Sequence, residues 1–203
     1  PSVRIIFTGD PDQLPPIGCG KVLADIVASK AIANTMLNIV KRQKGSTGIP
    51  EYSKLINQGK VPEQLTTGAI HFHETNKKEI SQVCCELYRQ SPEHCRVMAP
   101  TKVLVDEINT LTQEAVNRSG SRLEFEMHGE QLFLSLRLND IILFTQNHYD
   151  KGIQKGSLGI LSSVVASGES YGEVTLDTGD KIEVTQAVLD CMKLGYAITL
   201  HKA

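Results

Sequence analysis

Residues 3–16 have the sequence VRIIFTGDPDQLPP, and no other stretch of the chain says as much about its fold. A short apolar run, Val3 to Phe7, is stopped by Gly, Asp and Pro at positions 9–11, which is the pattern of a buried strand in a parallel sheet. Ligands of such sheets bind beyond the carboxyl ends of the strands, where this turn falls. Gln13 in the turn carries one acceptor and two donors, which suits contact with a phosphate or a water molecule.

The composition is that of an ordinary globular protein, with 203 residues, 40% hydrophobic and 22% charged. This length supports one large or two small hydrophobic cores. A domain that binds nucleic acid mainly by neutralising phosphates is usually basic, whereas the formal net charge here is −2. The charge still allows one half of a binding cleft, because the other half can supply the positive charge.

Five cysteines stand at positions 19, 84, 85, 95 and 191, without a C-x-x-C pair. Because their number is odd and Cys84-Cys85 falls in a helical pattern, we expect free thiols in a reducing compartment. No signal segment opens the sequence, and its apolar runs are far shorter than the roughly 20 residues that span a bilayer. The sequence therefore predicts a soluble, cytoplasmic protein that contacts no membrane.

Helix and strand signals alternate from residue 37 to about residue 144. The apolar spacing predicts helices around residues 22–28, 50–59, 80–88 and 104–115, the last with Leu104, Ile108, Leu111 and Ala115 on its buried face. Strands are predicted at residues 69–73 and 96–99. Such alternation favours a parallel sheet covered by helices.

The pattern changes between residues 141 and 187. Short β-prone runs fall at 141–145, 159–166, 173–176 and 181–184, with a hairpin-type turn at 177–180. This series predicts a small barrel or a curled sheet. Residues 196–200 then form another buried strand, so the β unit is predicted to be an insertion in an α/β domain.

The turn from Gly9 to Pro15 closely resembles the glutamine-bearing motif III of superfamily 1 helicases, in particular their RecD-like branch. Four further segments resemble that family in the expected order. They are the motif IV segment at 37–43, the strand–turn–helix at 97–117, the segment at 139–159 and the front half of motif V at 196–203. Where the RecD-like pattern has Gly-Asp, this chain has Asn139-Asp140, and we expect the turn geometry to be kept because the glycines that follow remain.

The resemblance implies an α/β fold with a RecA-like parallel sheet, the second lobe of a P-loop NTPase helicase, carrying a small SH3-like β-barrel insertion. Residues 1–36 would be a remnant of the first RecA-like lobe. The second lobe would comprise 37–143, the insertion 144–188, and the return to the second lobe 189–203.

The resemblance also implies a nucleotide site. Gln13 and Arg42 would be its catalytic pair, with Gly9, Asp10 and Asp12 in the turn that faces the nucleotide. Arginine donates a planar fork to phosphate oxygens and stabilises charge in phosphoryl transfer. ATP and Mg²⁺ would bind the full-length enzyme, but no G-x-x-x-x-G-K-[ST] loop occurs in these 203 residues. We therefore expect neither to bind tightly to this chain alone, which is predicted to be inactive.

Single-stranded DNA is the implied partner, with Pro100, Thr101, Asn147, Thr199 and His201 as its contacts. The implied activity is that of an ATP-dependent 5′-to-3′ DNA helicase. It would act in DNA recombination or repair, or with the partner subunits of an exodeoxyribonuclease V-like complex.

Simpler interpretations of single residues stay open. The opening turn could be an ordinary strand-end turn, and Arg42 a solvated residue at a helix end. His71 and His73 share a face of a predicted strand, but two histidines without further ligands make a weak metal site, so no metal is predicted there. Direct binding of Mg²⁺ by Asp10 and Asp12 is the less favoured alternative.

Two other functions stay open as well. The chain could be a non-catalytic protein-interaction module on a RecA-like scaffold, although a sequence without tryptophan is a poor source of a groove for proline-rich peptides. It could also be the motor part of a conjugation relaxase-helicase. A Walker-type loop upstream of Pro1 would indicate a motor, and a relaxase or nuclease domain beyond it would indicate the pathway.

Overall fold

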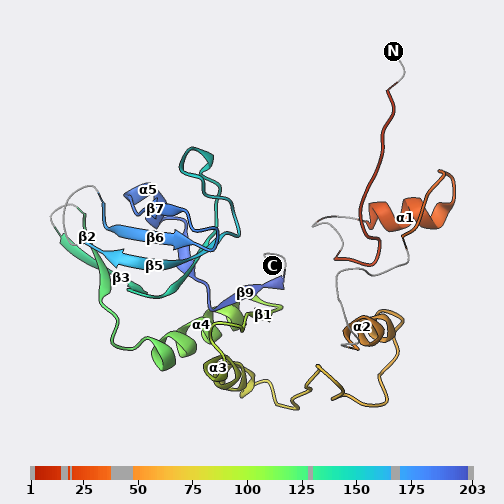
Figure 1. Ribbon diagram of the computed structural model, residues 1–203, viewed down its shortest axis with the longest axis horizontal. Helices are drawn as coiled ribbons and strands as arrows, with labels where there is room; N and C mark the ends of the chain where they lie inside the picture. Colours follow the sequence, from red (N-terminus) through yellow and green to blue (C-terminus); the bar gives the residue numbers. More distant parts are fainter. Residues whose placement is uncertain are drawn as a thin grey trace. The chain divides into compact units, whose positions relative to one another are not determined.

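The structure is a computed structural model, and it describes residues 3–14, 18, 20–37, 48–127, 130–165 and 170–200. The chain divides into two compact units, Pro1–Glu74 and Thr75–Ala203, and each is described by itself. Figure 1 shows their elements, coloured along the sequence. The lobe and insertion boundaries expected at residues 36, 143 and 188 stay a prediction.

The described part of the first unit holds two helices, α1 (Val22–Ser29) and α2 (Ile49–Asn57). Both were predicted from the apolar spacing. α2 has Pro50 in its first turn, where the fixed φ of proline suits a helix start. Gly59 follows the helix with a φ of 72°, and the backbone N–H of Lys60 donates to the carbonyl of Leu55 at 2.9 Å. This left-handed glycine stop is a common helix end.

Two strands predicted in this unit are wrong. Residues 3–7 pair with no strand in the described part of the chain, and the side chains of Val3, Ile5, Ile6 and Phe7 are 81%, 72%, 86% and 59% exposed. A buried strand needs hydrogen-bonding neighbours, and the described residues of this unit offer none. At residues 69–73 the chain turns instead, because Thr67 and Ile70 exchange two backbone hydrogen bonds of 2.9 Å.

The second unit begins with a small α/β layer. Strands β1 (Val97–Ala99) and β9 (Ala197–Thr199) pair in parallel. Helix α4 (Lys102–Val116) packs on this pair and against α3 (Ile80–Gln90). The core of the layer consists of Ala99, Val105, Ile108 and Ala197. The predicted parallel strands and their covering helices are confirmed.

The buried face of α4 differs from the predicted one. Its buried residues are Val105, Ile108, Asn109, Thr112 and Gln113. The predicted buried stripe, from Leu104 to Ala115, is rotated from this face, since Ala115 is exposed. Three of the five buried residues are polar, so the apolar spacing alone could not find the face that packs inward.

A five-stranded antiparallel sheet separates β1 from β9 in the sequence, with the strand order β7-β6-β5-β4-β8. Its strands are β4 (Ile141–Phe144), β5 (Leu158–Val164), β6 (Gly172–Leu176), β7 (Lys181–Glu183) and β8 (Met192–Leu194). The predicted series of short strands is confirmed. Among the described residues the sheet stays open, with β7 and β8 as its edges, and does not close into a barrel.

Sequence reasoning missed a hairpin of β2 (Arg122–Met127) and β3 (Glu130–Arg137). Its signal was the alternation of Leu123, Phe125 and Met127 ahead of Gly129. The described residues of this unit also form two short helices, η1 (Tyr149–Lys151) and α5 (Gln186–Leu189). Every helix that the structure describes is too short or too polar to cross a membrane.

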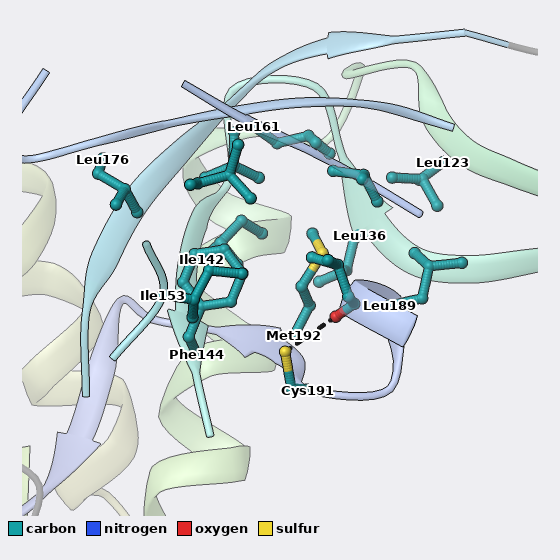
Figure 2. Packing of buried hydrophobic residues seen from close by; sticks show 14 residues of the cluster. Leu123, Leu136, Ile142, Phe144, Ile153, Leu161, Leu176, Leu189, Cys191 and Met192 are labelled. Atoms are coloured by element: carbon teal, nitrogen blue, oxygen red, sulfur yellow. Dashed lines mark hydrogen bonds between the residues drawn. The ribbon is translucent and has the colours of Figure 1, made fainter. Parts of the chain in front are cut away.

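The main hydrophobic core lies on one face of the five-stranded sheet, with contributions from the hairpin and α5. β6 alternates buried and half-buried residues, as expected of a strand with one face in a core. Figure 2 shows the cluster, in which Ile142, Phe144 and Ile153 lie close together and are fully buried. This packed core supports the strands from which the connecting loops extend.

Candidate functional site

The turn after residues 3–7 is held by the carboxylate of Asp10. Its Oδ1 accepts the backbone N–H of Asp12 at 3.0 Å, and its Oδ2 accepts Nε2 of Gln13 at 3.3 Å. A Cβ added at Gly9 would lie 2.7 Å from Cδ2 of Leu23. Glycine at this position therefore lets helix α1 pack against the turn.

The turn leaves the predicted nucleotide-sensing side chain open to solvent. Gln13 is exposed, so its amide is accessible to a ligand. Each carboxylate oxygen of Asp10 accepts one hydrogen bond within the turn. Arg42 and His201 lie outside the described residues. The pairing of Gln13 with Arg42 therefore stays a prediction, as does the DNA contact of His201.

Three of the predicted DNA contacts lie at one edge of the β1–β9 pair. Ala99 and Thr199 are register partners at the carboxyl ends of the two strands, and Pro100 and Thr101 follow Ala99 directly. Thr101 is the N-cap of α4, and its Oγ1 accepts the backbone N–H of Leu104 at 3.3 Å. This is the edge at which parallel sheets bind their ligands.

Asn147 lies in the loop between β4 and β5. Its Oδ1 accepts the backbone N–H of Lys155 at 2.7 Å. Within the same loop, His148 and Ile153 exchange backbone hydrogen bonds of 2.9 and 3.0 Å, and Ile153 is fully buried. Asn147 thus helps to shape a loop that is anchored in the main core.

Asp140 forms the centre of a buried polar site, to which no role was assigned from the sequence. Its Oδ1 accepts hydrogen bonds from Nδ2 of Asn117 at 2.6 Å and from Oη of Tyr196 at 2.7 Å. Its Oδ2 accepts from Nε2 of Gln113 at 2.5 Å and from the backbone N–H of Arg137 at 2.7 Å. A fully buried carboxylate needs such a set of donors, since burial otherwise disfavours its charged form.

The surroundings of Asp140 explain the protonation of its neighbours. Burial raises the pKa of Tyr196, and the negative charge of Asp140 raises it further. The ring of Tyr88 packs edge-on to that of Tyr196 with their centroids 5.6 Å apart, and burial raises the pKa of Tyr88 as well. Both tyrosines are therefore held in the neutral form, and Tyr196 donates to Asp140.

The guanidinium of Arg137 pairs with Glu114 and not with Asp140. The guanidinium of Arg137 instead donates to the carboxylate of Glu114 and, at 3.0 Å, to the carbonyl of Asn117. The hydrogen bond from Arg137 lowers the pKa of Glu114. Asp140 is thus stabilised by neutral donors, while the ion pair joins Arg137 of β3 to Glu114 of α4.

Within the described ranges, no group of three or more His, Cys, Asp and Glu residues could hold a metal ion. The thiols of Cys84, Cys85, Cys95 and Cys191 are free. Burial raises the pKa of Cys84 and of Cys191, which disfavours the reactive thiolate.

Known proteins are similar to this chain in sequence. A family model described as an AAA domain matches residues 1–77. The ATP-dependent RecD2 DNA helicase of Deinococcus radiodurans is 28% identical over 213 residues, an alignment that covers 100% of this chain and 27% of that protein. The chain is similar to the RecD-like helicases of superfamily 1. The resemblance that the motifs indicated is confirmed.

A solved structure supports the mixed α/β fold. A crystal structure of Pif1 helicase from Bacteroides, in complex with ADP-AlF3 and ssDNA, matches with a TM-score of 0.54 and 18% sequence identity. The match covers 96% of this chain and 52% of the Pif1 chain. The chain therefore spans about a quarter of the length of the RecD2 helicase and about half of the length of the Pif1 chain.

Proposed function

We propose that this chain is part of an ATP-dependent DNA helicase that couples ATP hydrolysis between two RecA-like lobes to 5′-to-3′ movement along single-stranded DNA. The observation that carries the proposal is the 28% sequence identity with a RecD2 helicase, in an alignment that covers the whole chain. The Gly9–Gln13 turn adds support, because it lies within the residues that match the AAA domain and exposes the Gln13 amide.

In the proposed nucleotide site, Gln13 contacts the terminal phosphate from the first lobe and Arg42 contacts it from the second. The amide of Gln13 can donate to a phosphate oxygen, and the fork of Arg42 stabilises charge that develops during phosphoryl transfer. ATP with Mg²⁺ supplies the transferred group when it is bound. Because these 203 residues contain no G-x-x-x-x-G-K-[ST] loop, we propose that they are inactive alone.

The proposed DNA path follows the carboxyl edge of the β1–β9 pair. Thr101 caps the N-terminus of α4, where the helix dipole favours phosphate. Thr199 lies on the neighbouring strand, and Asn147 and His201 complete the proposed contacts. The chain has five Tyr, five Phe and no Trp, so backbone contact is proposed to outweigh base stacking and to make binding largely indifferent to sequence.

The five-stranded sheet is proposed to be the SH3-like insertion of this helicase branch. Its place in the sequence supports this, because β1 and β9 pair with each other while the sheet lies between them along the chain. We propose further that the whole protein acts in the cytoplasm, in recombination or repair, with partner subunits of a nuclease complex.

The direction of movement tests the proposed function. The whole protein is given single-stranded oligonucleotides that carry streptavidin on a biotin at either the 3′ or the 5′ end. A 5′-to-3′ motor displaces streptavidin from the 3′ end in an ATP-dependent reaction. Displacement from the 5′ end alone, or none from either end, would contradict the proposal.

A further inference from the structure

Asn109 in α4 and Ala197 in β9 exchange two hydrogen bonds across 88 positions of sequence. Nδ2 of Asn109 donates to the carbonyl of Ala197 at 3.0 Å, and its Oδ1 accepts the backbone N–H of Ala197 at 2.8 Å. Both residues are buried, with 4% and 0% exposure. One side-chain amide thus engages the two backbone groups that a neighbouring strand would otherwise engage.

Strand β9 has few backbone hydrogen bonds to other strands, so the two bonds to Asn109 add substantially to those that hold it. In the described part of the chain its sheet has two strands, β1 and β9, each of three residues. Parallel pairing of this length is weak by itself. Without the amide of Asn109, two buried backbone groups of Ala197 would lack partners, which is unfavourable.

The residue before Ala197 is fixed to the same helix through Asp140. Tyr196 donates to Asp140 at 2.7 Å, and Asp140 also accepts from Gln113 and Asn117, at α4 and its C-cap. Two consecutive residues, Tyr196 just before β9 and Ala197 at its start, are therefore held against α4. The same helix begins at its cap, Thr101.

We propose that Asn109 is a positioning residue for DNA binding, which holds Ala197 against α4 and so fixes Thr199 beside the cap residue Thr101. The inference rests on the proposed function, in which these two threonines contact single-stranded DNA. Asn109 itself is buried and touches no DNA. When its amide is removed, β9 can shift against α4, and the two threonines no longer reach the DNA backbone together.

Binding of a labelled oligo(dT) to the whole protein, followed by fluorescence anisotropy over a series of salt concentrations, tests this inference. Asn109→Leu removes both hydrogen bonds at similar side-chain size. Ile108→Ala is the matched control, because it leaves a cavity at a fully buried neighbour and keeps the amide. Thr112→Val is a second control, since Oγ1 of Thr112 is buried without a partner among the described residues. All variants are compared at a temperature at which circular dichroism shows them folded.

Asn109→Leu is expected to bind oligo(dT) about tenfold more weakly, a loss of ~1.4 kcal/mol. Its plot of log affinity against log salt should also be shallower, because phosphate contacts are lost. Ile108→Ala and Thr112→Val should match the wild type in both respects. Should Asn109→Leu fail to fold, Asn109→Asp takes its place, since it keeps only the acceptor for the Ala197 N–H.

Two negative results are distinguishable. If the wild type binds oligo(dT) and the Asn109 variant has the same affinity and salt slope as Ile108→Ala, the positioning role is overturned and the proposed function stands. If the wild type itself does not bind oligo(dT), the proposed function falls and the inference falls with it.

Discussion

Oη of Tyr196 donates a hydrogen bond to Oδ1 of Asp140 at 2.7 Å, and the two side chains are 3% and 0% exposed. The bond joins the residue before β9 to the residue before β4, 56 positions away. Gln113 and Asn117 donate to the same carboxylate. Asp140 therefore links α4 to the β1–β9 pair and to the five-stranded sheet. The second unit is thus held together by a buried polar centre as well as by its hydrophobic cores.

Replacement of Asp140 by asparagine should destabilise the protein. An amide brings its own N–H groups toward the four donors that surround Asp140, so some of these donors lose their acceptor. We expect the free energy of unfolding to fall by about 2–4 kcal/mol, as measured by chemical denaturation. Asp177→Asn, in an exposed turn, is the control and should change it by less than about 0.5 kcal/mol. Equal losses in both variants would show that the buried centre contributes little.

Stability should fall at alkaline pH. Burial raises the pKa of Tyr196 and of Tyr88, so the folded protein keeps protons that the unfolded chain releases above about pH 10. The stabilisation is complete below that pH and is lost as the pH rises, with a slope of at most about 1.4 kcal/mol per pH unit for each tyrosine. Denaturation at pH 8 to 11 measures it. Tyr196→Phe should make the decline shallower, and a decline of unchanged slope would count against this assignment.

Asn139 should tolerate glycine better than a β-branched residue. Its φ of 70° lies in the left-handed region, which asparagine and glycine adopt more readily than other residues. The RecD-like pattern has glycine at this place. Asn139→Gly is expected to be neutral or slightly stabilising, whereas Asn139→Val should lower the unfolding free energy by about 1–2 kcal/mol. Thermal unfolding of the two variants checks this, and a valine variant as stable as the wild type would refute it.

Local signals in the sequence predicted most elements, and contacts distant in sequence account for the errors. The spacing of apolar residues located α4, but its buried face includes Asn109 and Gln113. Their partners, Ala197 and Asp140, lie 88 and 27 positions away. No periodicity within the helix shows that such partners exist, so polar residues on that face could not be placed inward from the sequence.

The sequence motifs predicted which residues belong to the candidate site, but they predicted the arrangement of these residues in space only in part. Parallel pairing of β1 with β9 brings Thr101 and Thr199 to one edge, as strand-end motifs of one sheet should. The run at residues 3–7 was predicted to be buried, because five apolar or long side chains in succession fit a central strand. Burial of such a run requires strands on either side, and local sequence carries no information about them.

Gln13 and Arg42 are proposed to act on ATP from two lobes of a DNA-dependent motor. DNA-stimulated ATP hydrolysis by the whole protein tests it most directly, with Lys54→Ala, which removes an exposed charge from α2, as the control. We predict that Arg42→Ala lowers the stimulated rate by at least about 100-fold, that Gln13→Ala also lowers it, and that Arg42→Lys does not restore it fully. Stimulated hydrolysis that is unchanged in both alanine variants would contradict the account.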